Sequence, residues 1–169
     1  MSAVQRLRAA TAPSHDAVDA AFGAHDLTDP VAYAAFLTAH ARALPAAEAV
    51  LAVQPDLPPW RERANLLAAD LRDLTVDPPL PAPFTLPDRL GAGWGALYVV
   101  EGSRLGGIML ARGVPATLPS RYLGARHLPG EWRDLLAAID RQGTDEAWVA
   151  GLLAGADATF DLYARAAVR

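Results

Sequence analysis

His15 and Asp19 stand one helical turn apart near the start of the chain. His15, Val18 and Phe22 recur at helical spacing, so they share one face of a predicted helix. An imidazole in this setting could bind a metal through Nε2 while the Asp19 carboxylate holds the Nδ1–H. Taken alone, His15 favours the simpler alternative, an ordinary surface pair of His and Asp four residues apart.

The other side chains narrow the chemistry that is available. His25 and His40 lack a comparable setting, and His127, in a loop before Pro129, is expected to be exposed. The chain has no Cys, which excludes disulfide bonds, thiolate ligands and a cysteine nucleophile. All fifteen basic residues are Arg, so a lysine Schiff base is excluded as well.

A second segment, residues 91–110, is apolar and helical in pattern yet rich in glycine. Each glycine inside a helix costs about 1 kcal/mol relative to alanine, so the cluster of Gly102, Gly106 and Gly107 needs a reason. One reason is the close approach of a second helix, and the other is the close approach of a flat ligand to the backbone. Gly107 beside Gly106 also allows a kink. The spacing by itself favours helix packing.

The remaining pattern predicts an all-α fold, a single-domain multi-helix bundle over residues 1–169. No alternating strand pattern and no internal repeat is present. Asp29 before Pro30 is a strong helix start, and Thr144 is the expected cap of the last helix. Helices are expected over residues 3–22 (in one or two pieces), 30–53, 60–74, 88–112, 131–141 and 144–165.

Composition restricts the class of protein. Hydrophobic residues make up 52% of the 169 residues, so the chain can bury a sizeable core. The net charge of −4 is spread without a basic stripe, so nucleic acid is not an expected partner. The sequence lacks a signal peptide and a bilayer-spanning apolar segment, which predicts a cytoplasmic protein with no membrane partner.

Two stretches resemble the bacterial, biliverdin-producing branch of the heme oxygenase family. The first runs from Leu7 to Asp19 and resembles the family's proximal helix, where a Leu-Arg-x-x-Thr run leads into the ligand histidine. The second runs from Tyr98 to Gly107 and resembles the distal helix. The order of the two motifs and their separation are also similar to the family.

The resemblance implies roles for the residues of the first stretch. His15 would be the proximal ligand of the heme iron and Asp19 its acidic partner, with Val18 on the proximal face of the heme. Arg8 corresponds to a basic position that pairs with a heme propionate. It lies seven residues before His15, which is about 10 Å along a helix.

For the second stretch the resemblance implies a distal wall. Gly102 and Gly106 would press on the heme, Gly107 would let the helix bend, and Tyr98 would contact the bound heme. Ser103 stands where mammalian members have an Asp that orders distal water, and bacterial relatives often have Ser. Together with backbone groups, Ser103 would hold the water that supplies protons.

Besides Ser103, two features depart from the family pattern: the chain is shorter than most members, and an acidic residue stands at position 157. Asp157 lies near the place on the last helix where a basic contact to a propionate is expected. The nearest basic alternatives are Arg165 and Arg112.

The implied activity is oxidative cleavage of heme to biliverdin, carbon monoxide and iron. It uses dioxygen and electrons from an external donor such as a ferredoxin or a reductase, and heme is both substrate and cofactor. The first alternative is a non-catalytic heme- or bilin-binding sensor or carrier of the same fold. The second is a helical interaction module in which the glycines serve packing only. A di-metal carboxylate bundle is disfavoured because no Glu-x-x-His pair occurs. A monomer is compatible with the sequence, which leaves the oligomeric state open.

Overall fold

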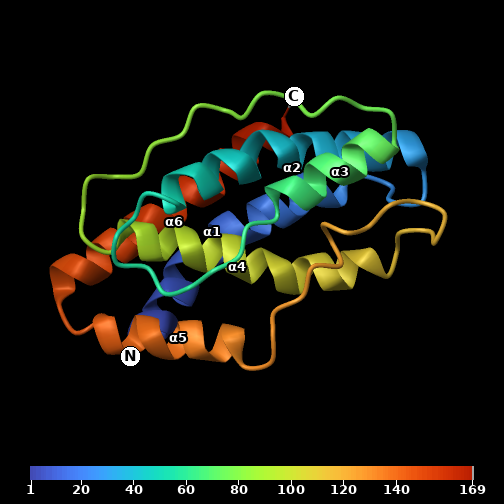
Figure 1. Cartoon of the computed structure of the whole chain (residues 1–169). Helices are drawn as coiled ribbons and strands as arrows, with labels where there is room; N and C mark the ends of the chain where they lie inside the picture. Colours follow the sequence, from blue (N-terminus) through green and yellow to red (C-terminus); the bar gives the residue numbers. More distant parts are fainter. Residues whose placement is uncertain (169) are drawn as a thin grey trace.

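The computed structural model describes residues 1–168, which form six helices and no strand (Figure 1). The helices are α1 (Ala3–Gly23), α2 (Pro30–Leu51), α3 (Ala64–Asp73), α4 (Ala92–Ala111), α5 (Glu131–Gln142) and α6 (Glu146–Ala167). The predicted all-α fold is confirmed. Arg169, the last residue of the predicted domain, lies outside the described residues, and the single-domain organisation stays a prediction.

Helix α1 is one continuous helix rather than two. Ser2 and Gln5 form a reciprocal capping box at its start, in which each side chain accepts a backbone N–H. Pro13 lies inside the helix and removes one backbone donor without ending it. His15 and Arg8 are therefore carried by a single rigid element.

Aspartate caps start α2 and α6. The Asp29 carboxylate accepts the Ala32 N–H at 2.8 Å, which confirms the start predicted from the Asp-Pro pair. At α6 the cap is Asp145, which accepts the Trp148 N–H at 2.9 Å, so the predicted cap at Thr144 was wrong by one residue. A carboxylate three residues before the N–H that it binds has the geometry of an N-cap.

Two helices begin four residues later than predicted, each for a tertiary reason. Glu48, buried on α2, accepts the backbone N–H groups of Arg63 and Ala64 at 2.7 and 3.1 Å, which fixes the start of α3 from outside the helix. The start of α4 follows Gly91, whose φ of 85° lies in the left-handed region that favours glycine.

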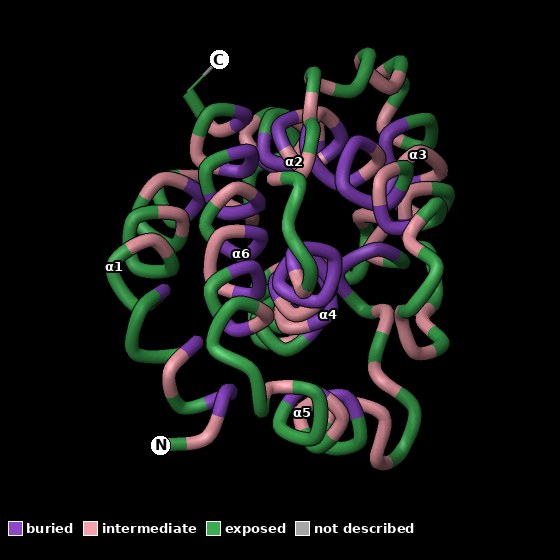
Figure 2. Tube along the Cα trace, turned by 90° about the vertical axis from the view of Figure 1, so that its left-hand side faces the viewer, coloured by how far each residue is buried: buried purple, intermediate pink, exposed green. Residues whose placement is uncertain are grey.

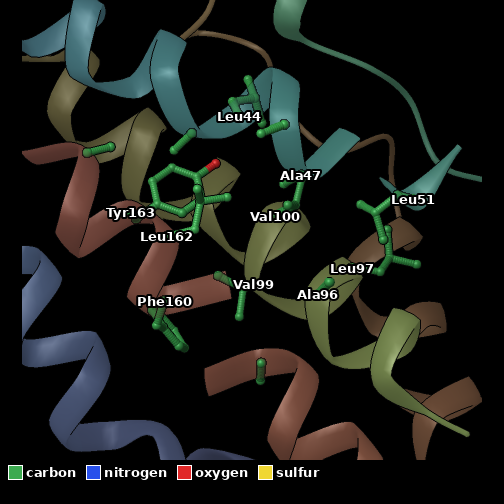
Figure 3. Close-up of a cluster of buried hydrophobic side chains, with 14 of the residues drawn as sticks. Leu44, Ala47, Leu51, Ala96, Leu97, Val99, Val100, Phe160, Leu162 and Tyr163 are labelled. Carbon is green, nitrogen blue, oxygen red and sulfur yellow. The ribbon is translucent and has the colours of Figure 1, made fainter. Parts of the chain in front are cut away.

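Helix α4 runs through the middle of the bundle (Figure 2), and its most extensive helix contact is with α6. Helix α6 also packs on α1 and α2, and α2 on α3. Figure 3 shows Leu44 of α2, Val100 of α4 and Leu162 of α6 in the hydrophobic cluster where these helices meet. Each large aliphatic side chain buried there contributes roughly 1.5–3 kcal/mol. None of the helices within residues 1–168 combines the length and the apolar character that a membrane crossing requires.

Small residues let α4 and α6 lie with their backbones in contact. A Cβ on Gly95 of α4 would overlap the carbonyl oxygen of Leu152, and one on Gly155 of α6 would overlap the carbonyl oxygen of Ala92. Glycine removes the Cβ atoms that would otherwise separate the two helices. The N-terminal half of α4 is thereby fixed on α6, and this orients the C-terminal half, which carries Gly102–Gly107.

Candidate functional site

A cavity of about 350 Å³ is lined by residues of α1, α2, α4, α5 and α6, by Arg63 just before α3 and by the loop between α4 and α5. Its size lies within the range of small-molecule sites, about 300–1,000 Å³. The structure brings both sequence motifs to this one place, while the roles given to single residues stay predictions. All nine residues predicted for the site line the cavity: Arg8, His15, Val18, Asp19, Tyr98, Gly102, Ser103, Gly106 and Gly107.

Further lining residues were not predicted, although Phe22 had been placed on the helix face of His15. Most of them are aromatic or aliphatic, which suits a flat apolar ligand. Val99 and Leu105 lie within the second motif and Leu110 follows it on α4, whereas the residues from α2, α5, α6 and the loops lie outside both motifs and are brought in only by the tertiary packing. The further lining residues are Phe22, His40, Arg63, Val99, Leu105, Leu110, Tyr122, Leu123, Trp132, Phe160 and Tyr163.

His15 lies at the open side of the cavity, with 58% of its side chain exposed. Its Nδ1 is 3.4 Å from Asp19 Oδ2 and 3.7 Å from Asp16 Oδ1. The ring meets Phe160 of α6 edge to face, with 6.1 Å between the ring centroids. Because both carboxylates lie on the Nδ1 side, Nε2 is the nitrogen left for a ligand.

The glycines in the C-terminal half of α4 differ in what faces them. A Cβ on Gly106 would have no atom within 4 Å, whereas one on Gly102 would lie 3.2 Å from Cη2 of Trp132. A Cβ on Gly107 would lie 3.0 Å from the carbonyl oxygen of Leu123. Backbone packing, which the spacing favoured, therefore accounts for Gly107 but not for Gly106. At Gly106 the backbone of α4 is open.

His40, Tyr122 and Tyr163 belong to the buried side of the cavity, and none of the three was predicted for the site. Burial lowers the pKa of His40 to about 3, and the positive charge of Arg63 adds to the effect, so the ring is neutral. The Tyr122 hydroxyl lies 2.7 Å from His40 Nδ1 and has no other acceptor within residues 1–168. This hydrogen bond ties His40 Nδ1 to the loop that carries Tyr122 and leaves Nε2 as the other polar atom of the ring.

Three buried polar atoms of the lining residues have no hydrogen-bond partner among residues 1–168, namely His40 Nε2, Arg63 Nε and Tyr163 Oη. A buried donor without a partner is destabilising, so such atoms mark a place that suits water or another polar guest. The buried side therefore places unpartnered polar atoms in a lining that is mostly aromatic or aliphatic.

The Ser103 hydroxyl is already engaged within the protein. It donates to the Val100 carbonyl at 2.6 Å and accepts from Nη2 of Arg63 at 2.7 Å. The Arg63 guanidinium also lies over the ring of Tyr122, 5.3 Å from its centroid. With its hydrogen committed, Ser103 can accept one more hydrogen bond but offers no donor to the cavity.

Buried polar contacts fix the loop that carries Tyr122. The Asp70 carboxylate of α3 accepts the Tyr122 N–H at 2.9 Å, and the Tyr33 hydroxyl donates to the Pro119 carbonyl at 2.8 Å. Both hydrogen bonds hold backbone positions of the loop in place. The aromatic lining from this loop is therefore preorganised.

His127 of the same loop is nearly buried, with 10% of its side chain exposed, so the expectation of an exposed histidine was wrong. Its ring stacks on Trp132, and its Nε2 lies 3.5 Å from Glu101 Oε2. Glu101 in turn pairs with Arg104 at 3.0 Å, and both are buried on α4. The loop folds back onto this ion pair, and burial lowers the pKa of His127.

At the open side of the cavity, α1 supplies the expected basic residue, whereas α6 does not supply one. Arg8 is exposed and lines the cavity. Asp157 is exposed on α6, and neither Arg165 nor Arg112 is among the described residues that line the cavity. Arg165 instead pairs with Asp161 one turn away on its own helix, at 3.0 Å. Arg8 is thus the accessible cation for an anionic ligand group.

Comparisons with known proteins agree with the two motifs. The chain is 35% identical to a heme oxygenase of Xanthomonas campestris pv. campestris, over 60% of this chain and 64% of that protein. The match therefore spans slightly less than two thirds of the relative's length. No protein-family model matches the chain.

A solved structure extends the similarity to the whole fold. The chain superposes on the heme oxygenase from Neisseria meningitidis, solved with NO and CO bound, with a TM-score of 0.80. The superposition covers 99% of this chain and 90% of that one at 23% sequence identity. The predicted resemblance to the heme oxygenase family is confirmed, and the fold is the heme oxygenase fold.

Proposed function

We propose that the chain is a heme oxygenase that binds heme in the cavity lined by α1 and α4 and cleaves it to biliverdin, carbon monoxide and iron. One observation carries the proposal: two motifs that are remote in the sequence line a single cavity. The sequence similarity to one heme oxygenase and the fold of another support the same activity.

The residues of the cavity fit a flat macrocycle that contains iron. The backbone of α4 is open at Gly106, where a Cβ would have no atom within 4 Å. Across the lining, His15 offers one imidazole nitrogen, which is a common axial ligand of heme iron. When bound, heme supplies the iron that reacts with dioxygen and the ring that is oxidised.

His15 would bind the iron through Nε2. Asp19, whose Oδ2 lies 3.4 Å from Nδ1, would orient the ring and hold the Nδ1 hydrogen. Arg8 at the open side would pair with a propionate, because a guanidinium forms charge-assisted hydrogen bonds with a carboxylate. These contacts would fix the macrocycle in the cavity from the side of α1.

On the buried side, proton donation would come from His40 and Tyr163 rather than from Ser103. His40 would donate as the tautomer with its hydrogen on Nε2, and Tyr163 would donate through its hydroxyl; neither atom has a partner among residues 1–168. Either group can hold a water molecule within the cavity. Ser103 would act there as an acceptor that orients such water.

Titration of the purified protein with hemin tests the proposal. The wild type should give a Soret band typical of histidine-bound heme, and His15→Ala should lose that band and recover it when imidazole is added. His25→Ala is the matched control, because His25 does not line the cavity. An unchanged band in His15→Ala would overturn the ligand assignment.

Turnover is tested by adding a reductant and dioxygen to the heme complex. Loss of the Soret band with growth of biliverdin absorption supports the oxygenase. A stable heme complex with no bilin product would instead support the carrier or sensor alternative. A cytoplasmic location and an external electron donor form part of the same proposal.

A further inference from the structure

The wall that α4 presents to the cavity is interrupted at Gly102 by an indole. Cη2 of Trp132 lies 3.2 Å from the place where a Cβ on Gly102 would sit, so the ring edge rests directly against this glycine. Gly106, one turn further along, has open space in the same direction. Gly102 and Gly106 were both predicted to press on the heme, yet a ligand would meet an indole edge at Gly102 and open backbone at Gly106.

Neighbouring rings restrict the orientation of the Trp132 indole. Its ring lies against Tyr98, with 5.4 Å between centroids and 33° between planes. On another side it stacks on His127, at 5.5 Å and 26°. The neighbouring residue Glu131 accepts hydrogen bonds from Arg61 at 2.8 Å and from the backbone of the loop, which pins the first turn of α5.

We propose that Trp132, and not the backbone of Gly102, is the surface that a flat macrocycle meets at this end of α4, and that Trp132 thereby determines which edge of the macrocycle is presented for cleavage. The inference rests on the proposed function. It differs from a wall made equally of Gly102 and Gly106, because the ligand would touch backbone only at Gly106.

The consequence for specificity follows from the shape of heme. Its four bridging carbons are chemically similar, so the carbon that is opened depends on how the protein orients the ring in its plane. A rigid indole at one end of the wall limits that rotation and contributes stacking or edge contacts. Trp132 is thus a specificity-determining residue for the proposed reaction.

Zinc protoporphyrin IX, a flat macrocycle that does not react with dioxygen in the dark, is the first probe. Trp132→Phe should weaken its binding several-fold and Trp132→Ala about tenfold or more, as expected for loss of aromatic contact. Trp148→Phe is the matched control, because Trp148 is also half-buried but packs on Trp94 away from the cavity. Unchanged thermal unfolding would show that the variants are folded.

A double variant tests direct contact. Gly102→Ala should weaken probe binding, because the new methyl group displaces the indole. Combining it with Trp132→Phe should cost little beyond Trp132→Phe alone, since the smaller ring leaves room for the methyl group. Full additivity of the two losses would overturn the contact.

The second readout is the isomer composition of the bilin product. Trp132→Ala should convert the wild-type isomer pattern into a broader mixture, and Trp148→Phe should leave the pattern unchanged. If wild type binds the zinc porphyrin and Trp132→Ala keeps both its affinity and its isomer pattern, this inference fails while the proposed function stands. If wild type does not bind the probe, the proposed function fails first.

Discussion

The two halves of α4 use the same residue type for opposite purposes. In the N-terminal half, Gly95 faces the backbone of α6, and any Cβ there would overlap the carbonyl oxygen of Leu152. In the C-terminal half, Gly106 faces open space beside the cavity. What a glycine does in this helix is decided by what lies opposite, and the sequence around each position does not reveal it.

The neighbouring elements explain the difference. Helix α6 carries its own small residues, Gly155 opposite the start of α4 and Gly151 opposite the turn before it, so two backbones can meet there. Opposite the end of α4 stand the side chains of α1, the loop and α5, which enclose a cavity instead. The N-terminal half of α4 is a joint, by which we mean the backbone contact with α6 that sets the position of the helix. The C-terminal half is the surface that a ligand would use.

The largest expected effect is on the joint. Gly95→Val should lower the free energy of unfolding by more than about 3 kcal/mol, because the side chain must push two helices apart. The same substitution at Gly106 should change it by less than about 1 kcal/mol, since nothing lies within 4 Å of the new Cβ. Urea denaturation measures both. Equal losses at the two positions would contradict the division of α4 into a joint and a ligand surface.

The next largest effect is on heme binding, where the C-terminal half of α4 should matter more than the N-terminal half. Gly106→Val should weaken heme binding by about thirtyfold or more, roughly 2 kcal/mol, because its side chain enters the space where the macrocycle would lie. The protein should remain folded, so titration with hemin can be compared directly with wild type. Wild-type affinity in this variant would show that the ligand does not approach α4 at Gly106.

A third prediction concerns His40, on the buried polar side of the cavity beside the C-terminal half of α4. Burial lowers the pKa of His40 from 6.5 to about 3. Between these two pH values His40 is protonated in the unfolded chain and neutral in the folded chain, so a lower pH favours unfolding. This contribution to stability is complete above about pH 6.5 and is lost as the pH falls toward 3, by up to about 1.4 kcal/mol per pH unit. His40→Gln should flatten that part of the urea-derived stability curve. Parallel curves for variant and wild type would contradict a neutral, buried His40.

The smallest effect is expected at Gly107. A methyl group there would lie 3.0 Å from the carbonyl oxygen of Leu123, so the loop must shift slightly. Alanine also gains about 1 kcal/mol of helix propensity over glycine, which offsets that strain. Gly107→Ala should therefore change the thermal midpoint by only a few degrees, in contrast to Gly95→Val. A loss as large as that of Gly95→Val would place Gly107 in the joint as well.

The sequence predicted the elements well where local chemistry sets them. The Asp29–Pro30 start was confirmed, because a cap and a fixed φ act within one helical turn. The start of α3 was misplaced, because its cap is Glu48, fifteen residues away on another helix. Caps from outside a helix leave no local pattern, so their positions follow only from tertiary packing.

The candidate site divides in the same way. The motifs around His15 and Gly106 are local, and every residue predicted from them lines the cavity. His40 and Trp132 belong to helices with no motif, and their part in the cavity depends on how α2 and α5 pack around α4. A lone histidine or tryptophan in an apolar helix is indistinguishable in sequence from an ordinary core residue.

By itself, the sequence determined that this protein is an all-helical bundle with an imidazole and a glycine-rich helix suited to a flat ligand. Those properties depend on residue type and on spacing within a helix. Only the tertiary structure decided which glycines face a backbone, which face open space and which face the indole of Trp132. The physical reason is that a glycine only leaves out a side chain. What occupies that space depends on which element the fold places opposite the glycine.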